Sequence, residues 1–459
     1  MNNIPGLQFE NIVLVCLSYF LILLVNRRTN SESALLLVAL LTFHHVVAYL
    51  YGFYLSTPQN ETDPVDFLYL ASECTKFGYC GYFGEHLYAN YLAKMLTVGH
   101  SVYFIFLLNV LFFVISLYYF IRISDFFGLK GNRNISILLY SIWPSVVYFT
   151  TLNYRETFEL YLLIAGVYFG LTGSKSDSFL RMLASMLLLL LMGMFHIKGL
   201  LFLSPVLFII VVSQTLPLTV LSLGKKIILL VMMSIAVYSS NAMNDDYLDE
   251  LWQSKREAEL EKLLLANPES QNIDVKEKVL SGNALIFEQN KEKFLSEKAY
   301  PESDPGYIDT FMRKVVYYRA SLTWVTRPQT AFLSTISDKS IPEFIATYSL
   351  VYLEYLFSPF IFQVNSFHSL LAYAESVLRL ILFASALVML KRNRQTRILF
   401  VIYLAITAMW AIGVISFGAS IRHHVQTNWI LVLLGVPIIS EYLSSKFRVN
   451  NEKMDIVSR

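Results

Sequence analysis

Charged and histidine side chains interrupt the long apolar runs of this chain at four places. These places are "DPVD" with Asp63 and Asp66, "NYRETF" with Arg155 and Glu156, "FHIKG" with His196 and Lys198, and "SIRHHV" with Arg422, His423 and His424. A carboxylate can accept the proton of an attacking hydroxyl. Arginine, lysine and histidine can hold an anionic phosphate. The four groups together therefore contain the residue types that a reaction on a phosphate-linked substrate needs.

The first two groups also have structural explanations. Asp63 and Asp66 are three residues apart, so in a helix both carboxylates share one face and one could act as a general base toward a sugar hydroxyl. An acidic first turn with Pro64 at the first helical position explains the same residues as a helix start. Arg155 could grip a phosphate while Glu156 holds its guanidinium, or the pair could be a solvated turn that ends two helices. Both alternatives remain open for each group.

Composition places these groups in a membrane protein. The chain has 459 residues, of which 55% are hydrophobic and 15% are charged, and its mean hydropathy is +0.51. That balance is too apolar for a protein whose whole surface faces water. The net charge of +2 gives no electrostatic footprint for nucleic acid, so no nucleic-acid partner is expected. The sequence predicts an all-α, polytopic integral membrane protein with the lipid bilayer as a partner.

Twelve apolar runs are candidates to cross or enter the bilayer, because about 20 helical residues span about 30 Å of hydrocarbon. They cover 9–25, 34–54, 101–121, 135–152, 157–172, 182–197, 199–221, 227–240, 343–363, 369–390, 397–416 and 426–443. The polar stretches between them predict four regions. These are an N-terminal membrane domain over 1–240 with about eight spans and a loop at 56–100, a large and mainly helical loop over 241–340, a C-terminal membrane domain over 341–443, and a tail over 444–459.

The orientation follows from lysine and arginine, which are in excess in short cytoplasmic loops. They occupy every second loop, at Arg27 and Arg28, at Arg122, Lys130 and Arg133, at Lys175 and Arg181, and at Lys225 and Lys226. The N-terminus is then outside and the tail is cytoplasmic, provided that one apolar run does not cross.

The run over 343–363 is the one that does not cross in this prediction. A full crossing there would put the basic loop "KRNRQTR" outside, against the rule. Glu343, Glu354 and Pro359 interrupt its apolar character and its helical hydrogen bonding. We expect a re-entrant or interfacial segment at 343–363, and therefore eleven spans.

With this topology the four chemical groups all lie at the outer ends of the helices. Three adjacent cationic or potentially cationic residues, Arg422, His423 and His424, oppose the positive-inside tendency there, which favours anion binding. Lys198 has an alternative explanation, because a lone lysine at the end of a span commonly reaches to the headgroups.

The remaining signals are weak. His44 and His45 have no carboxylate or cysteine at ligand spacing, so we expect a hydrogen-bonded buried pair and no metal. No phosphate-binding glycine-rich loop or zinc spacing occurs, and no cofactor is expected. Cys74 and Cys80 flank "TKFGY", and their spacing alone leaves open whether they form a disulfide.

The chain resembles a class of bacterial membrane proteins over most of its length. The stretches "WPSVVYFTTLNYRETFELYLLIAGVYFGL", "DPVDFLYLA", "YLFSPF" and "GASIRHH" are similar to those of O-antigen and exopolysaccharide polymerases and of multi-spanning glycosyltransferases of the GT-C type. Asp63 stands where such proteins carry an acidic residue early in the first outer loop. One motif differs, since "FHIKG" stands where many relatives carry an arginine-proline pair.

The resemblance implies a glycosyltransferase that acts on undecaprenyl (polyprenyl) phosphate- or pyrophosphate-linked saccharides. The site would lie at the outer face of the bacterial inner membrane, during surface polysaccharide (O-antigen, lipopolysaccharide or exopolysaccharide) assembly and alongside other membrane proteins of that assembly. Asp63 or Asp66 would be the base, and the cationic residues would hold the phosphate at headgroup depth. The alternative function is a flippase for the same lipid-linked sugar. Transporters tend to have paired repeats and interrupted helices, and the sequence shows neither.

Overall fold

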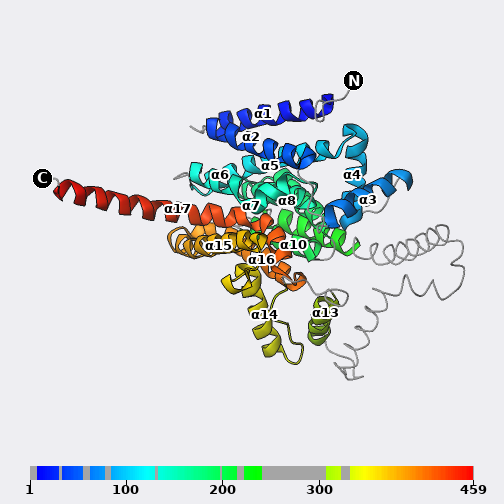
Figure 1. The fold of residues 1–459 in the computed structure, drawn as a ribbon. Coiled ribbons are helices and arrows are strands. Elements are labelled where there is room, and N and C mark those ends of the chain that lie inside the picture. The colour runs from blue at the N-terminus through cyan, green and yellow to red at the C-terminus, as the bar shows by residue number, and fades with distance from the viewer. Residues whose placement is uncertain are drawn as a thin grey trace, which may run out of the picture. The chain divides into compact units, whose positions relative to one another are not determined.

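The structure is a computed structural model that describes residues 8–29, 34–54, 62–77, 84–129, 133–196, 199–213, 222–239, 307–321 and 331–457 (Figure 1). Within these residues all the regular elements are helices, apart from one isolated bridge between Ala331 and Ser416. The prediction of an all-α protein is confirmed for this part of the chain.

Eight helices of the described residues are long and apolar enough to cross a membrane. They are α1 (Phe9–Thr29), α2 (Ala34–Phe53), α5 (Val102–Phe126), α8 (Arg155–Lys175), the helix Ser222–Ser239, α15 (Phe367–Arg392), α16 (Arg397–Gly413) and α17 (Phe417–Val457). Many of their large apolar side chains are exposed, for example Phe20, Leu35 and Ile228. Exposed apolar side chains on long helices are the expected surface toward lipid. The chain is a multi-pass membrane protein.

The other four apolar runs form shorter helices. Run 182–197 overlaps α9 (Phe179–Phe195), run 199–221 contains α10 (Gly199–Val212), and run 343–363 overlaps α14 (Ile341–Phe357). Run 135–152 is divided into α6 (Arg133–Ile142) and α7 (Pro144–Thr150). This candidate span is therefore not one continuous helix, because Pro144 has no N–H to continue the helical ladder. The chain therefore does contain an interrupted apolar helix, which the sequence did not reveal.

The polar stretches contain further helices, and residues 331–340 of the predicted large loop are not helical. The loop 56–100 contains α3 (Thr62–Phe77) and α4 (Gly84–Gly99), which pack against each other, and the large loop contains α13 (Tyr307–Ser321). Cys74 of α3 forms a disulfide and Cys16 is a free thiol. Cys80, the candidate partner from the sequence, lies outside the described residues, as does most of the predicted large loop.

The chain forms two compact units. The first comprises 1–234, 360–407 and 421–459, and the second comprises 235–359 and 408–420. In the first unit α8 packs against α5, α9 and α10, and α1 and α2 pack against α5. The contacts of α8 are close, since a Cβ atom on Gly170 would lie 2.3 Å from a methyl carbon of Val211 on α10. Small residues allow helix backbones to approach in this way.

The second unit is organised around the C-terminal end of α16. The Arg319 guanidinium of α13 donates hydrogen bonds to the carbonyls of Ala411, at 2.6 Å, and Val414, at 2.9 Å. The last carbonyls of a helix have no partner within it, and a cation there also interacts favourably with the helix dipole. Burial lowers the pKa of Arg319 to about 10, so the side chain stays charged at neutral pH.

Candidate functional site

The N-terminal end of α8 carries the centre of the site. α7 ends at Thr150, and α8 begins at Arg155 after a short turn whose last residue, Tyr154, provides no side-chain cap. The Thr157 hydroxyl of α8 donates to the Phe149 carbonyl of α7, at 2.6 Å, and fixes the turn. The first turns of α8 contain Arg155, Glu156 and Glu159. Carboxylates are favoured at this position, because the N-terminal end of a helix carries partial positive charge.

Arg155 is held by three groups from outside α8. Its guanidinium donates to the carbonyl of Phe195, at 3.3 Å, and to Nε2 of His196, at 3.3 Å. The same guanidinium lies over the ring of Phe67 on α3, 5.6 Å from the ring centre. A flat guanidinium against an aromatic face is a favourable cation–π arrangement. The position of Arg155 is therefore defined by α3 and by the end of α9 as well as by its own helix.

The hydrogen bonds of His196 define its tautomer. A guanidinium can only donate, so His196 Nε2, which faces Arg155, accepts and carries no proton. Nδ1 then carries the proton and donates it to Glu159 Oε1, at 2.8 Å. Gln426 of α17 donates to the other oxygen of Glu159, at 2.5 Å. Glu159 thus connects α8, the end of α9 and α17.

Glu156 joins the two arginines of the site. Nε of Arg422 on α17 donates to Glu156 Oε1, and Nε of Arg155 lies 4.0 Å from the same oxygen. The Arg422 guanidinium lies over the ring of Tyr154, 5.4 Å from its centre. The closer partner of Glu156 is therefore Arg422 and not its neighbour in the sequence.

The negatively charged side chains of the site are more deeply buried than the positively charged ones. The side chains of Glu156 and Glu159 are 0% exposed, whereas those of Arg155 and Arg422 are 16% and 17% exposed. An anion that approaches the described part of the site meets the guanidinium groups before the carboxylates. Of the two alternatives for Arg155 and Glu156, the solvated turn does not fit the structure, because the side chains of Glu156 and Glu159 are fully buried.

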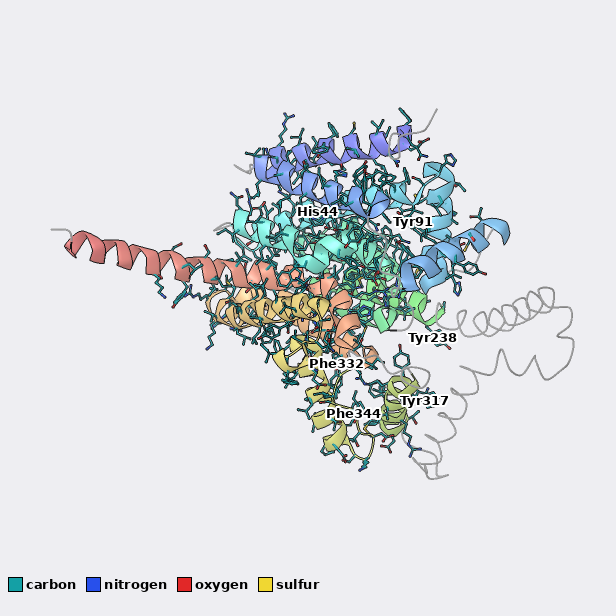
Figure 2. All side chains as sticks on the ribbon, viewed as in Figure 1. His44, Tyr91, Tyr238, Tyr317, Phe332 and Phe344 are labelled. Atoms are coloured by element: carbon teal, nitrogen blue, oxygen red, sulfur yellow. The ribbon has the colours of Figure 1, made fainter. Side chains whose placement is uncertain are left out.

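Histidines and tyrosines complete the surroundings. The His423 ring lies edge-on to that of His196, with 5.4 Å between ring centres, and His424 is fully buried. Tyr88 of α4 interacts electrostatically with Arg155 and Glu156, and burial raises the pKa of its phenol well above the usual value. The phenol therefore stays protonated and adds no negative charge. Tyr91, one turn along α4 (Figure 2), stacks on Phe158 of α8.

The structure brings together most of the residues that the sequence singled out. Arg155, Glu156, His196, Arg422 and His423 form one network. Asp63 and Asp66 belong to α3, whose Phe67 contacts Arg155, but their side chains lie outside the described part of the chain. Lys198 also lies outside the described residues.

Sequence reasoning missed Glu159 and Gln426. Each stands four residues after an arginine of the site, Glu159 after Arg155 and Gln426 after Arg422. Residues at this spacing share one face of a helix, and a carboxylate inside an apolar run is expensive unless it has a partner. That spacing was the signal that could have found both residues.

A second polar cluster surrounds the break between α6 and α7. In a continuous helix the Ser145 N–H would donate to the Ser141 carbonyl. It donates instead to Glu375 of α15, at 2.6 Å, and the Ser141 carbonyl accepts from Nε2 of His44, at 2.9 Å. Glu375 also accepts from the Trp143 indole, at 3.0 Å. His44 (Figure 2) is therefore a hydrogen-bonded buried histidine, as expected.

No group of three or more histidine, cysteine, aspartate or glutamate side chains within the described ranges is arranged to hold a metal ion. No protein-family model, curated protein or solved structure matches the chain.

Proposed function

We propose that the protein is a membrane glycosyltransferase or polysaccharide polymerase that uses saccharides linked to polyprenyl phosphate or pyrophosphate. The observation that carries the proposal is the pair of partly exposed arginines, Arg155 and Arg422, at the end of two long apolar helices. A lipid-linked sugar has its phosphate at the headgroup plane, and guanidinium groups bind phosphate oxygens through paired hydrogen bonds. Both arginines are supported by aromatic rings, which fixes their position before a ligand arrives.

The proposed reaction is the transfer of a sugar to a hydroxyl acceptor. The acceptor oxygen forms a bond with the anomeric carbon, and the bond from that carbon to the phosphate oxygen breaks. The leaving phosphate keeps the electron pair, and Arg155 and Arg422 stabilise the charge that develops on it. Lys198 and the histidines at positions 196, 423 and 424 belong to the surroundings of the same phosphate site in this proposal, with His196 as a neutral side chain that accepts from Arg155.

Asp63 or Asp66 accepts the proton of the acceptor hydroxyl in this scheme. Asp63→Asn is therefore expected to lower transfer by about 10²-fold or more with normal insertion, whereas Asp66→Asn has a smaller effect. Polymer formed per unit of inserted protein measures both. Normal activity in both variants would remove the base assignment and leave these residues as a helix start.

The finer topology is also a proposal. We place the N-terminus in the periplasm, the tail in the cytoplasm and eleven spans between them, with α14 as the segment that does not cross. α14 has 17 residues, begins after Ser340 and ends before Pro359. Ile345 and Leu353 are 57% and 50% exposed on it, whereas Glu354 is buried and accepts from the Ser334 N–H. The exposed apolar side chains can face lipid, while the Glu354 carboxylate is buried and bonded within the protein, as an ionisable group in a membrane segment commonly is.

Reporter fusions test this topology. Fusions within 241–339 and after Ser366 should both report the periplasm, because no span separates them. Fusions at Asn393 and at the C-terminus should report the cytoplasm. A cytoplasmic signal after Ser366 would mean that α14 crosses the membrane and would contradict the eleven-span arrangement.

The test of the function is the surface polysaccharide of a cell that lacks the gene. A polymerase predicts that one repeat unit remains per lipid anchor, and a single-sugar transferase predicts a complete ladder of chains that lack one sugar. An unchanged pattern on the gel would contradict both forms of the proposal.

A flippase is the second candidate, and one observation favours it. The α6–α7 break, with Glu375 of α15 and His44 of α2 bonded to its backbone, is an interrupted apolar helix of the kind that transporters use. Loss of a flippase would leave lipid-linked saccharide on the cytoplasmic leaflet. Loss of the transferase would leave it on the outer leaflet, so the leaflet on which the intermediate accumulates separates the two.

A further inference from the structure

We infer that the Glu156 carboxylate is an internal anion that occupies the position of a ligand phosphate between Arg155 and Arg422, and that an incoming anion displaces it. The inference rests on the proposed function in one respect, namely that these two arginines hold a phosphate. It adds a regulation of the same site, since the binding position is filled by the protein itself until an anion competes for it.

The first observation is that one carboxylate oxygen lies between both cations. Arg422 Nε donates to Glu156 Oε1, and Arg155 Nε lies 4.0 Å from that same atom. A phosphate oxygen at this point would be near both guanidinium groups. Glu156 Oε1 therefore occupies a position that suits a ligand oxygen, although Arg155 Nε is also 3.7 Å from Glu159 Oε1.

The second observation is that this internal arrangement leaves polar atoms unsatisfied. Among the described residues, Glu156 Oε2 and Arg155 Nε are both buried and neither has a hydrogen-bond partner. Buried polar groups are satisfied in the great majority of cases, and each exception requires a reason. A phosphate offers more oxygens than the single shared carboxylate oxygen and could accept from Arg155 Nε, which the carboxylate does not reach.

The third observation is the difference between the two glutamates. Glu159 is fixed by hydrogen bonds from His196 and Gln426. Among the described residues, Glu156 pairs with the two arginines and interacts electrostatically with the Tyr88 phenol, and it accepts a hydrogen bond from Arg422. The two positive charges of the arginines are balanced by the two negative charges of the glutamates. The arginines therefore attract an incoming anion fully only after one carboxylate has moved away from them. Glu156 is the carboxylate with fewer bonds to break, and the arginines that it neutralises are the exposed part of the site.

Binding of inorganic pyrophosphate to the purified full-length chain in lipid nanodiscs tests the inference. Glu156→Gln keeps the shape of the side chain and removes its charge, so its affinity for pyrophosphate should be about tenfold or more higher than that of the wild type. Glu441→Gln is the matched control, because Glu441 pairs with Arg392 at an exposed position, and its affinity should equal the wild-type value. Calorimetry measures the affinity for pyrophosphate. For a variant of low stability, the affinity is obtained from the increase in Tm with pyrophosphate concentration.

The outcomes separate the inference from the proposed function. If the wild type binds pyrophosphate and Glu156→Gln binds it equally or more weakly, the internal-anion inference is wrong and the proposed function is untouched. If neither protein binds pyrophosphate, the inference is overturned together with the phosphate-holding role of the arginines. If Glu156→Gln fails to fold, Glu156→Asp is the second variant, because its shorter side chain moves the carboxylate away from the arginines by one methylene. Glu156→Asp should bind pyrophosphate more tightly than the wild type. Equal or weaker binding by Glu156→Asp would overturn the inference.

Discussion

Replacement of Arg155 by lysine is expected to remove nearly all activity, with a loss of about 10²-fold or more. The Arg155 guanidinium bonds to the Phe195 carbonyl and to His196 while its face lies on the Phe67 ring. Lysine has the same charge, but its ammonium group is compact. It cannot bond to Phe195 and His196 and at the same time offer two parallel N–H donors to a phosphate. Loss of one donor to a developing oxyanion commonly costs a factor of about 10² to 10³ in rate. Polymer formed per unit of inserted protein is the measurement.

Two further variants make this result interpretable. Arg155→Ala should be only slightly worse than Arg155→Lys, because the fork is lost in both. Arg133→Lys is the control. Arg133 lies outside the site and pairs with Asp125, with 3.3 Å between the charged atoms, so this variant should keep near-normal activity. Near-native output from Arg155→Lys would show that only the charge of Arg155 matters, and the phosphate-holding role would be lost.

Replacement of Glu375 by alanine is expected to lower the free energy of unfolding by about 3–5 kcal/mol. The change leaves the Trp143 indole N–H and the Ser145 backbone N–H without their acceptor in a buried place. It also removes the carboxylate that interacts electrostatically with buried Arg379, one turn along α15. Thermal unfolding of the protein in detergent, compared as Tm with the wild type, measures the loss.

The exposed Glu441 provides the comparison for this prediction. Glu441→Ala removes an ion pair with Arg392 on the surface, which is worth about 0–1 kcal/mol. A Tm for Glu375→Ala that is no lower than that of Glu441→Ala would show that the α6–α7 break does not depend on Glu375.

The membrane helices could be predicted because their signal is local. A helix in lipid must satisfy its own backbone and present apolar side chains, so each run can be found without knowing its neighbours. The break at Trp143–Pro144 was not predicted, although the proline was visible. Its freed backbone groups bond to His44 and Glu375, which come from distant parts of the sequence. The consequence of a proline depends on such partners.

The site could be predicted in part for a similar reason. Charges at helix ends are conspicuous in an apolar sequence, and the topology rule placed Arg155, His196 and Arg422 on one side of the membrane. The structure brings these residues into one network. The pairing of Glu156 with Arg422 could not be predicted, because the two residues are 266 positions apart and adjacency in the sequence favoured Arg155 as the partner. The tautomer of His196 likewise follows only from its spatial neighbours.

The central claim is that the two arginines hold the phosphate of a lipid-linked sugar during transfer. The most direct measurement uses the purified full-length chain in proteoliposomes with a polyprenyl pyrophosphate-linked saccharide and follows release of the polyprenyl pyrophosphate and elongation of the saccharide. The account predicts both products with the wild type and a loss of about 10²-fold or more with Arg155→Lys. Movement of the intact lipid-linked saccharide between leaflets with no released polyprenyl pyrophosphate would contradict it.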